Sequence, residues 1–398
     1  MKTIEIIFLV SLLIVFYSYL GYGIVLFVLV KLKRLISKPK NDNITEEEFP
    51  EITIMIPAFN ERDYIHQKVN NTRKLDYPKE KIKQVWVTDG SDDGTPDILK
   101  QYDDITIFHK NERKGKIAAM NRGIQFVESP IIVFTDANTI LSKDALAEIA
   151  KLFRDPQIGC VSGEKRIYMD DTEAAASAGE GIYWKYESKL KKWDAELYTA
   201  VGAAGELFAI RTALYEEVEE DTILDDFIIS LRIAMKGYKI GYNPKAYAIE
   251  TGSHNVKEEL KRKIRISAGG FQSIFRLKTL LNPFKHGMLS FQYISHRVLR
   301  WAASPFLLLL IFTFNFYLSL QAENTLLNQS VYKFTLGVQL VFYIFALMGR
   351  FFENRKIKFK PFFIPYYFLV MNYSAYLGLY RYAYGNQSVK WERAKRGS

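Results

Sequence analysis

Cysteine is nearly absent from this chain, which has one, Cys160, in 398 residues. A single cysteine excludes an intramolecular disulfide, so the composition gives no indication of an oxidising compartment. Acidic residues are the minority among the charged ones, 44 against 54 Lys and Arg, which gives a formal net charge of +10. Such an excess suits a nucleic acid or an anionic membrane surface, and the placement of the basic residues decides between them.

Charge is missing altogether from residues 6–30, an apolar run long enough to cross a hydrocarbon core of roughly 30 Å. The basic stretch KLKRLISKPK follows this run, whereas the basic end of a cleaved signal peptide precedes a shorter apolar stretch. We therefore predict a retained transmembrane helix over residues 1–31 and a basic linker over 32–49. Because basic residues favour the cytoplasmic side, the domain that follows is expected in the cytoplasm.

Apolar runs return near the C-terminus, at residues 302–320, 334–349 and 361–380. We predict transmembrane or re-entrant helices over 302–381 and a basic tail over 382–398. The first link between these runs is poor in basic residues and the second is rich in them, as expected for an outside loop followed by a cytoplasmic one. A third crossing would place the basic tail outside. Either the last run, broken by Pro365 and Asn372, is re-entrant or interfacial, or the charge rule fails.

The stretch HGMLSFQYISHRVLRW precedes these runs and has apolar residues at helical intervals. The basic residues His296, Arg297 and Arg300 lie among them. This pattern predicts a basic amphipathic helix over 281–301 that lies in the membrane plane. The alternative is a helix that covers the soluble domain.

Residues 50–280 alternate short apolar bursts with helical periods. We expect strands at 52–57, 84–89, 105–109 and 131–136, and helices at 66–75, 95–102, 116–127 and 143–153. This alternation predicts an α/β domain with a doubly wound, mostly parallel sheet flanked by the transmembrane helices. Ligands of such sheets bind at the carboxyl ends of the strands, which is where this sequence places acids.

Asp89 ends the second expected strand and is followed by the turn sequence GSDDGT. A carboxylate at this place can accept hydrogen bonds from the hydroxyls of a ribose or from a base. Asp92 and Asp93 have a simpler interpretation, as turn residues and caps of the next helix. Lys114 and Lys116 flank a glycine at the start of another helix, where they form either an anion site or a solvated basic turn.

Asp136 and Asn138 follow the strand 131–136. Two oxygen ligands two residues apart can face one Mg²⁺ or Mn²⁺, which takes further ligands from water and phosphate. Two more acids, Asp225 and Asp226, begin an apolar run with a helical pattern that continues to Gly237. One acid at this place is an ordinary helix cap, so the second needs another explanation.

The order of these motifs resembles glycosyltransferase family 2: PAFNE, TDGSDDGT, GK with an Asn five residues after the Lys, DAN, LDD, and an R-x-x-R run before membrane helices. It is most similar to the membrane-embedded, inverting branch that includes cellulose, hyaluronan, chitin and poly-N-acetylglucosamine synthases. The resemblance covers about residues 50–280 and implies a GT-A-like nucleotide-diphospho-sugar transferase fold. It also implies a nucleotide-sugar donor and a divalent cation, Mg²⁺ or Mn²⁺.

Carried over to this sequence, the resemblance assigns donor-binding roles. Pro57, Asn60 and Glu61 would shape the nucleotide pocket, and Asp89 would contact the base. Lys116 would approach the diphosphate, and Asp136 would bind the sugar nucleotide and, with Asn138, the metal. The family has D-x-D here, so Asn138 offers a neutral and weaker ligand.

The resemblance also assigns the catalytic acids. Asp226 would be the general base, and Asp225 would either cap its helix or hold the acceptor. Gly205 and Glu206 lie in the region where relatives receive the acceptor. Trp184 and Trp193, which precede that region, would either stack on a sugar or pack in the core.

The family's Q-x-x-R-W box is only partly matched. Arg265 stands at the arginine that meets the diphosphate, Arg262 replaces the glutamine, and Ile266 replaces the tryptophan. That tryptophan faces the acceptor sugar in polymerising members, so its loss argues against processive synthesis.

We therefore expect an integral protein of the cell (inner) membrane with a cytoplasmic catalytic domain. It would transfer a sugar, most simply from a UDP-linked donor, to a lipid-linked or envelope polysaccharide acceptor. The basic residues gather at membrane edges and at phosphate-sized sites, which indicates membrane lipid and not nucleic acid as the partner. The alternatives are a processive synthase that also exports its product and an inactive nucleotide-binding scaffold.

Overall fold

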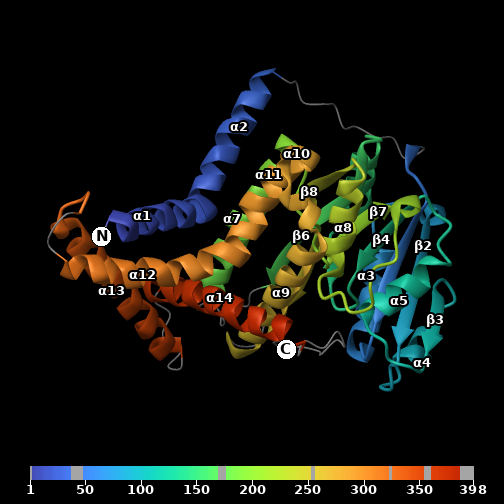
Figure 1. The fold of residues 1–398 in the computed structure, drawn as a ribbon. Helices are drawn as coiled ribbons and strands as arrows, with labels where there is room; N and C mark the ends of the chain where they lie inside the picture. The colour runs from blue at the N-terminus through green and yellow to red at the C-terminus, as the bar shows by residue number, and fades with distance from the viewer. Residues whose placement is uncertain are drawn as a thin grey trace.

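The computed structural model describes residues 2–36, 48–168, 176–251, 256–321, 325–353 and 360–385. An α/β domain lies beside a group of long helices drawn from both ends of the chain (Figure 1). The first helix, α1 (Lys2–Phe16), packs against α12 (Ser304–Leu320), so the two ends of the chain meet in one helical layer.

The α/β domain is built on one sheet, to which eight strands of the described chain contribute. Its order is β3-β2-β1-β4-β7-β6-β8-β5, and β1 is parallel to both β2 and β4. The predicted mostly parallel, doubly wound sheet is confirmed, with β7 and β5 as antiparallel additions. The strands are β1 (Ile52–Ala58), β2 (Ile82–Asp89), β3 (Thr106–Lys110), β4 (Ile131–Thr135), β5 (Ile140–Leu141), β6 (Ile158–Tyr168), β7 (Leu207–Arg211) and β8 (Lys239–Thr251).

Helices connect the strands and cover the sheet. Those of the domain are α3 (Ile65–Arg73), α4 (Thr95–Leu99), α5 (Lys116–Ile124), α6 (Ala145–Phe153), α7 (Ala176–Leu197), α8 (Asp225–Met235) and α9 (Val256–Arg276). Short 3₁₀ turns lie at Arg62–Tyr64, Lys79–Lys81, Thr212–Leu214 and Lys278–Leu281. The helices expected at 66–75, 95–102, 116–127 and 143–153 correspond to α3, α4, α5 and α6.

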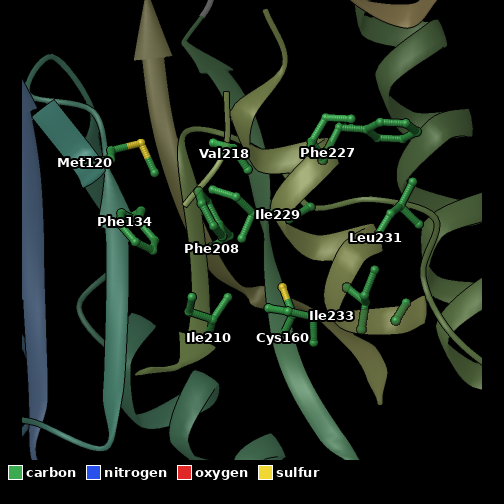
Figure 2. Packing of buried hydrophobic residues seen from close by; sticks show 14 of the residues in the cluster. Met120, Phe134, Cys160, Phe208, Ile210, Val218, Phe227, Ile229, Leu231 and Ile233 are labelled. Carbon is green, nitrogen blue, oxygen red and sulfur yellow. The ribbon is translucent and has the colours of Figure 1, made fainter. Parts of the chain in front are cut away.

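Two apolar cores lie on the two faces of the sheet. Strand β1 is buried along its whole length, with Met55 in one core and Ile54 and Ile56 in the other. Figure 2 shows the first core, where α8 packs against the sheet beside Phe134 and Phe208, whose rings stack with centroids 4.8 Å apart. This packing fixes α8, and its N-terminal end carries the two adjacent aspartates.

Three helices of the described chain are long and apolar enough to cross a membrane: Lys2–Ile36, Met288–Leu320 and Gln329–Phe352. The first contains α1, a π-helical turn η1 (Tyr17–Gly21) and α2 (Tyr22–Ile36), and it bends between α1 and α2 (Figure 1). The second contains α11 (Met288–Tyr293), a π-helical segment η7 (Ile294–Ala303) and α12, and the short α10 (Pro283–His286) precedes it. The third is α13 (Gln329–Glu353).

The amphipathic helix predicted over 281–301 stays a prediction as a separate helix in the membrane plane. From Met288 onward the segment is continuous with α12. His296 and Arg297 are buried, and their side chains lie within 2.7 Å of acids on α7: His296 Nδ1 with Asp194 and Arg297 Nη1 with Glu187. These contacts favour the alternative, a helix that covers the soluble domain.

The last apolar run forms α14 (Lys360–Ala383), which includes Pro365 and packs against α9 of the α/β domain. It lies outside the three helices that meet the length and hydropathy needed for a span. Asn372 on this helix accepts a hydrogen bond from the Tyr19 hydroxyl at 2.8 Å. These contacts favour the interfacial interpretation of residues 361–380, which stays a prediction.

Candidate active site

One large cavity, of about 1590 Å³, brings together most of the predicted site residues. It lies where α5, the loop after β4, the loop before β7 and the start of α8 meet α9. The predicted residues on its wall are Lys116, Asp136, Gly205, Glu206, Asp225, Asp226, Arg262 and Arg265. Donor, acceptor and catalytic candidates therefore share one space.

A lysine lies between two of the acids at the centre of the cavity. Lys116 Nζ is 2.8 Å from Asp136 Oδ1 and 3.4 Å from Asp225 Oδ2. Burial alone lowers the pKa of Lys116, but the charges of Asp136 and Asp225 outweigh it and raise that pKa. The N-cap position of α8 is Leu224, so Asp225 lies inside the first turn and is directed at Lys116 instead of serving as the cap.

Asp226 has the properties of a general base. Burial and the neighbouring charge of Asp225 raise the pKa of the Asp226 carboxyl to about 7. A base with a pKa near the working pH combines a useful ionised fraction with a strong tendency to take a proton. Gly205 lies beside it, and a Cβ there would be 3.3 Å from Asp226 Oδ2. The glycine therefore leaves room next to the carboxylate.

Glu206 is held by Lys165, a residue that sequence reasoning missed. Lys165 is buried on β6 and donates hydrogen bonds to Glu206 and, at 2.6 Å, to Glu250 Oε2. Burial raises the pKa of Glu206, but Lys165 outweighs it and the net pKa is lowered. Glu206 is therefore an ionised carboxylate on the cavity wall, able to accept hydrogen bonds from hydroxyls.

Asp89 supports the loop that carries Lys116. Its buried carboxylate accepts hydrogen bonds through Oδ2 from the backbone N–H groups of Lys114, at 2.9 Å, and Gly115, at 2.6 Å. Oδ1 has no hydrogen-bond partner within the described residues. Asp89 and Pro57 line a second, small pocket together with Phe59 and Arg113, whose guanidinium lies 3.8 Å from the Phe59 ring centroid. The predicted contact between Asp89 and a base stays a prediction.

Asn60 and Glu61 are not on the wall of either cavity. Asn60, at φ +53°, donates a hydrogen bond from Nδ2 to Asp92 Oδ1 at 2.7 Å and accepts one from the Asp92 N–H at 3.0 Å. Asp93 Oδ1 accepts a hydrogen bond from the Thr95 N–H at 2.9 Å. These residues shape the loop between β2 and α4, so the turn interpretation of Asp92 and Asp93 holds.

The donor set for a metal is small. Among the described residues, no group of three or more His, Cys, Asp or Glu side chains is placed to hold an ion. Asp136 lines the cavity and offers a carboxylate, whereas Asn138 is not on the wall of this cavity; Asp225 Oδ2 is buried without a hydrogen bond in the described chain. The carboxylates of Asp136 and Asp225 fit Mg²⁺ or Mn²⁺ if the phosphates of a substrate and water complete the shell.

A buried lysine lies behind Asp136. Lys68 donates hydrogen bonds to Thr135 Oγ1 and to the carbonyl oxygen of Thr139, both at 2.9 Å. Burial lowers the pKa of Lys68 to about 7, and the charge of Asp136 partly offsets this. No sequence pattern indicates a buried Lys68, because a lysine on a largely polar helix normally points to solvent.

Two tryptophans, Trp184 and Trp301, line the large cavity. The ring centroid of Trp184 lies 5.6 Å from Lys165 Nζ. Trp193 is not on the cavity wall and packs against Phe27, with ring centroids 5.5 Å apart. Trp301, which sequence reasoning missed, packs on Phe227 with centroids 5.2 Å apart. The cavity therefore has aromatic walls although Ile266 stands at the tryptophan of the family's box.

Residues 53–219 match the sequence profile described as Glycosyl transferase family 2. These residues form a glycosyltransferase family 2 domain. This chain is 27% identical over 247 residues to a poly-beta-1,6-N-acetyl-D-glucosamine synthase of Staphylococcus aureus, an alignment that covers 60% of this chain and 58% of the relative. It is 26% identical over 255 residues to a Bacillus subtilis protein named "Probable glycosyltransferase YdaM", covering 60% of this chain and 59% of that one.

A solved structure has the same fold as the glycosyltransferase chain over nearly its whole length. It is a mannosyltransferase from Pyrobaculum calidifontis in complex with GDP-Man and Mn²⁺. The two match with a TM-score of 0.71 at 21% identity, over 96% of this chain and 100% of that one. The GT-A-like fold is therefore confirmed, together with the arrangement of long helices around it.

Proposed function

We propose that this protein is a membrane-bound inverting glycosyltransferase that acts on a nucleotide-sugar donor. Its acceptor is a lipid-linked or envelope polysaccharide, and its catalytic domain faces the cytoplasm at the cell (inner) membrane. The observation that carries the proposal is the meeting of Lys116, Asp136, Asp225 and Asp226 on one cavity wall, from three separate parts of the chain. An inactive scaffold would have no chemical need for this arrangement.

In this mechanism Asp226 takes the proton from the acceptor hydroxyl. The hydroxyl oxygen then attacks the anomeric carbon of the donor sugar from the face opposite the nucleotide, and the bond to the diphosphate breaks. Lys116 and Arg265 stabilise the negative charge of the leaving diphosphate. Glu206 orients the acceptor by accepting a hydrogen bond. A divalent cation, Mg²⁺ or Mn²⁺, held by Asp136 and Asn138 would add positive charge at the diphosphate.

The donor is proposed to be UDP-linked, as the family resemblance suggests. A GDP-linked donor is the second candidate, because the mannosyltransferase with the same fold is in complex with GDP-Man. The missing tryptophan at Ile266 favours the addition of one or a few sugars over processive synthesis.

The test is to incubate membranes that contain the protein with a panel of nucleotide sugars, with and without Mn²⁺. We expect metal-dependent transfer with one donor, and Asp226→Asn should reduce it about a hundredfold or more, the usual contribution of a general base. Donor binding should persist in this variant, because the amide keeps the size of the carboxyl. Transfer at the native rate by Asp226→Asn would remove Asp226 from the mechanism, and long products at early times would favour the processive synthase.

A further inference from the structure

The large cavity does not end at the catalytic residues. Its wall also includes Tyr19 and Leu20 from the first candidate span and Ile364, Phe368 and Met371 from α14. One continuous space therefore connects Asp226 with apolar side chains of these two helices. A glycan without a lipid chain would fit these apolar side chains poorly. Its sugar hydroxyls would lose their water there without finding hydrogen-bond partners on the protein.

A buried cation lies on the wall of this space. Lys191 of α7 is 8% exposed, lines the cavity, and makes no hydrogen bond or ion pair with the residues that the structure describes. Burial lowers the pKa of Lys191 and the nearby Arg297 lowers it further, whereas the charges of Glu187, Glu164 and Glu206 partly offset this. Burying a charge without a partner of opposite sign is costly, which indicates that an anion from outside the protein pairs with the Lys191 ammonium group.

The acids near Lys191 already have other partners. Glu187 lies 2.7 Å from Arg297 Nη1 and 3.0 Å from Arg300 Nη1, so one carboxylate serves two guanidinium groups. Glu164 accepts hydrogen bonds from the hydroxyls of Ser188 and Tyr242. Glu206 is likewise paired, with Lys165, so each of the three acids near Lys191 already binds another group.

We propose that the cavity binds an acceptor with a phosphate between its sugar and a lipid chain, and that Lys191 binds this phosphate. The cavity wall offers the three kinds of group that such an acceptor needs: carboxylates for the reacting sugar, a buried cation for the phosphate, and apolar side chains for the lipid chain. A phosphoester is anionic and can join a sugar to a lipid chain, and an ammonium group binds it strongly once both are removed from water. This inference rests on the proposed transferase function and narrows its acceptor to a lipid-linked phosphate.

The test uses the full-length protein in a non-ionic detergent and three probes: decyl phosphate, decanol and inorganic phosphate. We expect decyl phosphate to quench tryptophan fluorescence, since Trp184 and Trp301 line the cavity. Decanol and inorganic phosphate should each bind at least about tenfold more weakly, because each lacks one half of the interaction. Lys191→Met should reduce the affinity for decyl phosphate to that for decanol, and Lys191→Arg should preserve the preference for the phosphate.

The matched control is Lys192→Met, which removes an exposed lysine from the same helix and should leave all three affinities unchanged. Equal binding of decyl phosphate and decanol by the native protein would overturn the inference. So would a phosphate preference that survives in Lys191→Met, or one that disappears in Lys116→Met alone, because the phosphate would then occupy the donor site. Metal-dependent hydrolysis of the donor, measured on the same Lys191→Met sample, tests the transferase function separately.

Discussion

At the scale of single residues, the Asp226 carboxyl and its surroundings make activity depend on pH. Burial and Asp225 raise its pKa to about 7 from an ordinary value of 3.8, so the ionised form that acts as base is lost as pH falls through 7. We expect kcat/KM to drop by about tenfold per pH unit below that value. The measurement is a pH–rate profile between pH 5 and 9.

Asp225→Asn provides the control for this profile. It removes a charge that raises the pKa of Asp226, so the inflection should move to lower pH even if the maximal rate also changes. A profile that is flat from pH 5 to 8 would show that Asp226 does not titrate as the base.

We expect Lys165 to contribute to the free energy of unfolding as well as to hold Glu206 in the cavity. It is the buried partner of both Glu206 and Glu250, and Lys165→Met would leave two carboxylates in a poorly solvated place. Breaking a buried pair in this way costs about 3–5 kcal/mol, which a denaturation experiment in detergent would measure. Lys83→Met is the matched control, because that pair with Glu128 is exposed and should change stability by about 0.5 kcal/mol or less. Equal effects of the two variants would contradict the role given to Lys165.

At the scale of elements, strands β1 to β4 could be predicted from the sequence, and β5 to β8 could not. Strands β1 and β4 are almost wholly apolar and buried on both faces, so their patterns are strong. The residues before β7 were recognised only as an acceptor region, and β6 and β8 mix charged with apolar residues. Lys165 was missed for a related reason, because its partners Glu206 and Glu250 lie 41 and 85 positions away. A pattern of neighbouring residues in the sequence cannot predict an ion pair between residues so far apart.

The loop before β7 contains two glycines with different expected roles. Gly202 has φ +86°, and a Cβ there would lie 2.2 Å from a ring carbon of Phe227, so Gly202→Ala should lower Tm through strain and a clash in the core. At Gly205 a Cβ would instead meet Asp226 Oδ2 at 3.3 Å. Gly205→Ala should therefore reduce kcat severalfold with little change in Tm. Measuring Tm and transfer rate on both variants checks this, and the reverse pattern would contradict it.

At the scale of the whole molecule, buried charges join the transferase domain to a membrane helix. Glu187 on α7 contacts His296, Arg297 and Arg300 of η7, and all four side chains are buried. Glu187→Gln leaves two arginines without their carboxylate and should cost about 3–5 kcal/mol of stability. Glu196→Gln is the matched control. Glu196 is another acid of α7 that pairs with a base on a long apolar helix, here Arg34 of the first helix, but this pair lies at the surface. It should cost about 1 kcal/mol or less in the same thermal unfolding experiment.

The sequence pattern does not distinguish a helix whose bases serve the lipid surface from one that covers the domain, and the reason is physical. An amphipathic helix shows where its polar face lies but not what covers that face. Here acids of α7, more than 90 positions earlier, contact His296 and Arg297, and only the folded chain brings them together.

The unbroken helix Met288–Leu320 carries Arg297 and Trp301 at the cavity and continues through the apolar residues of α12. A helix that crosses a bilayer changes its tilt when the hydrocarbon thickness changes. Because the two parts of this helix are continuous, such a tilt would shift the acceptor wall relative to Asp226. The thickness of the surrounding lipid would then act on turnover directly.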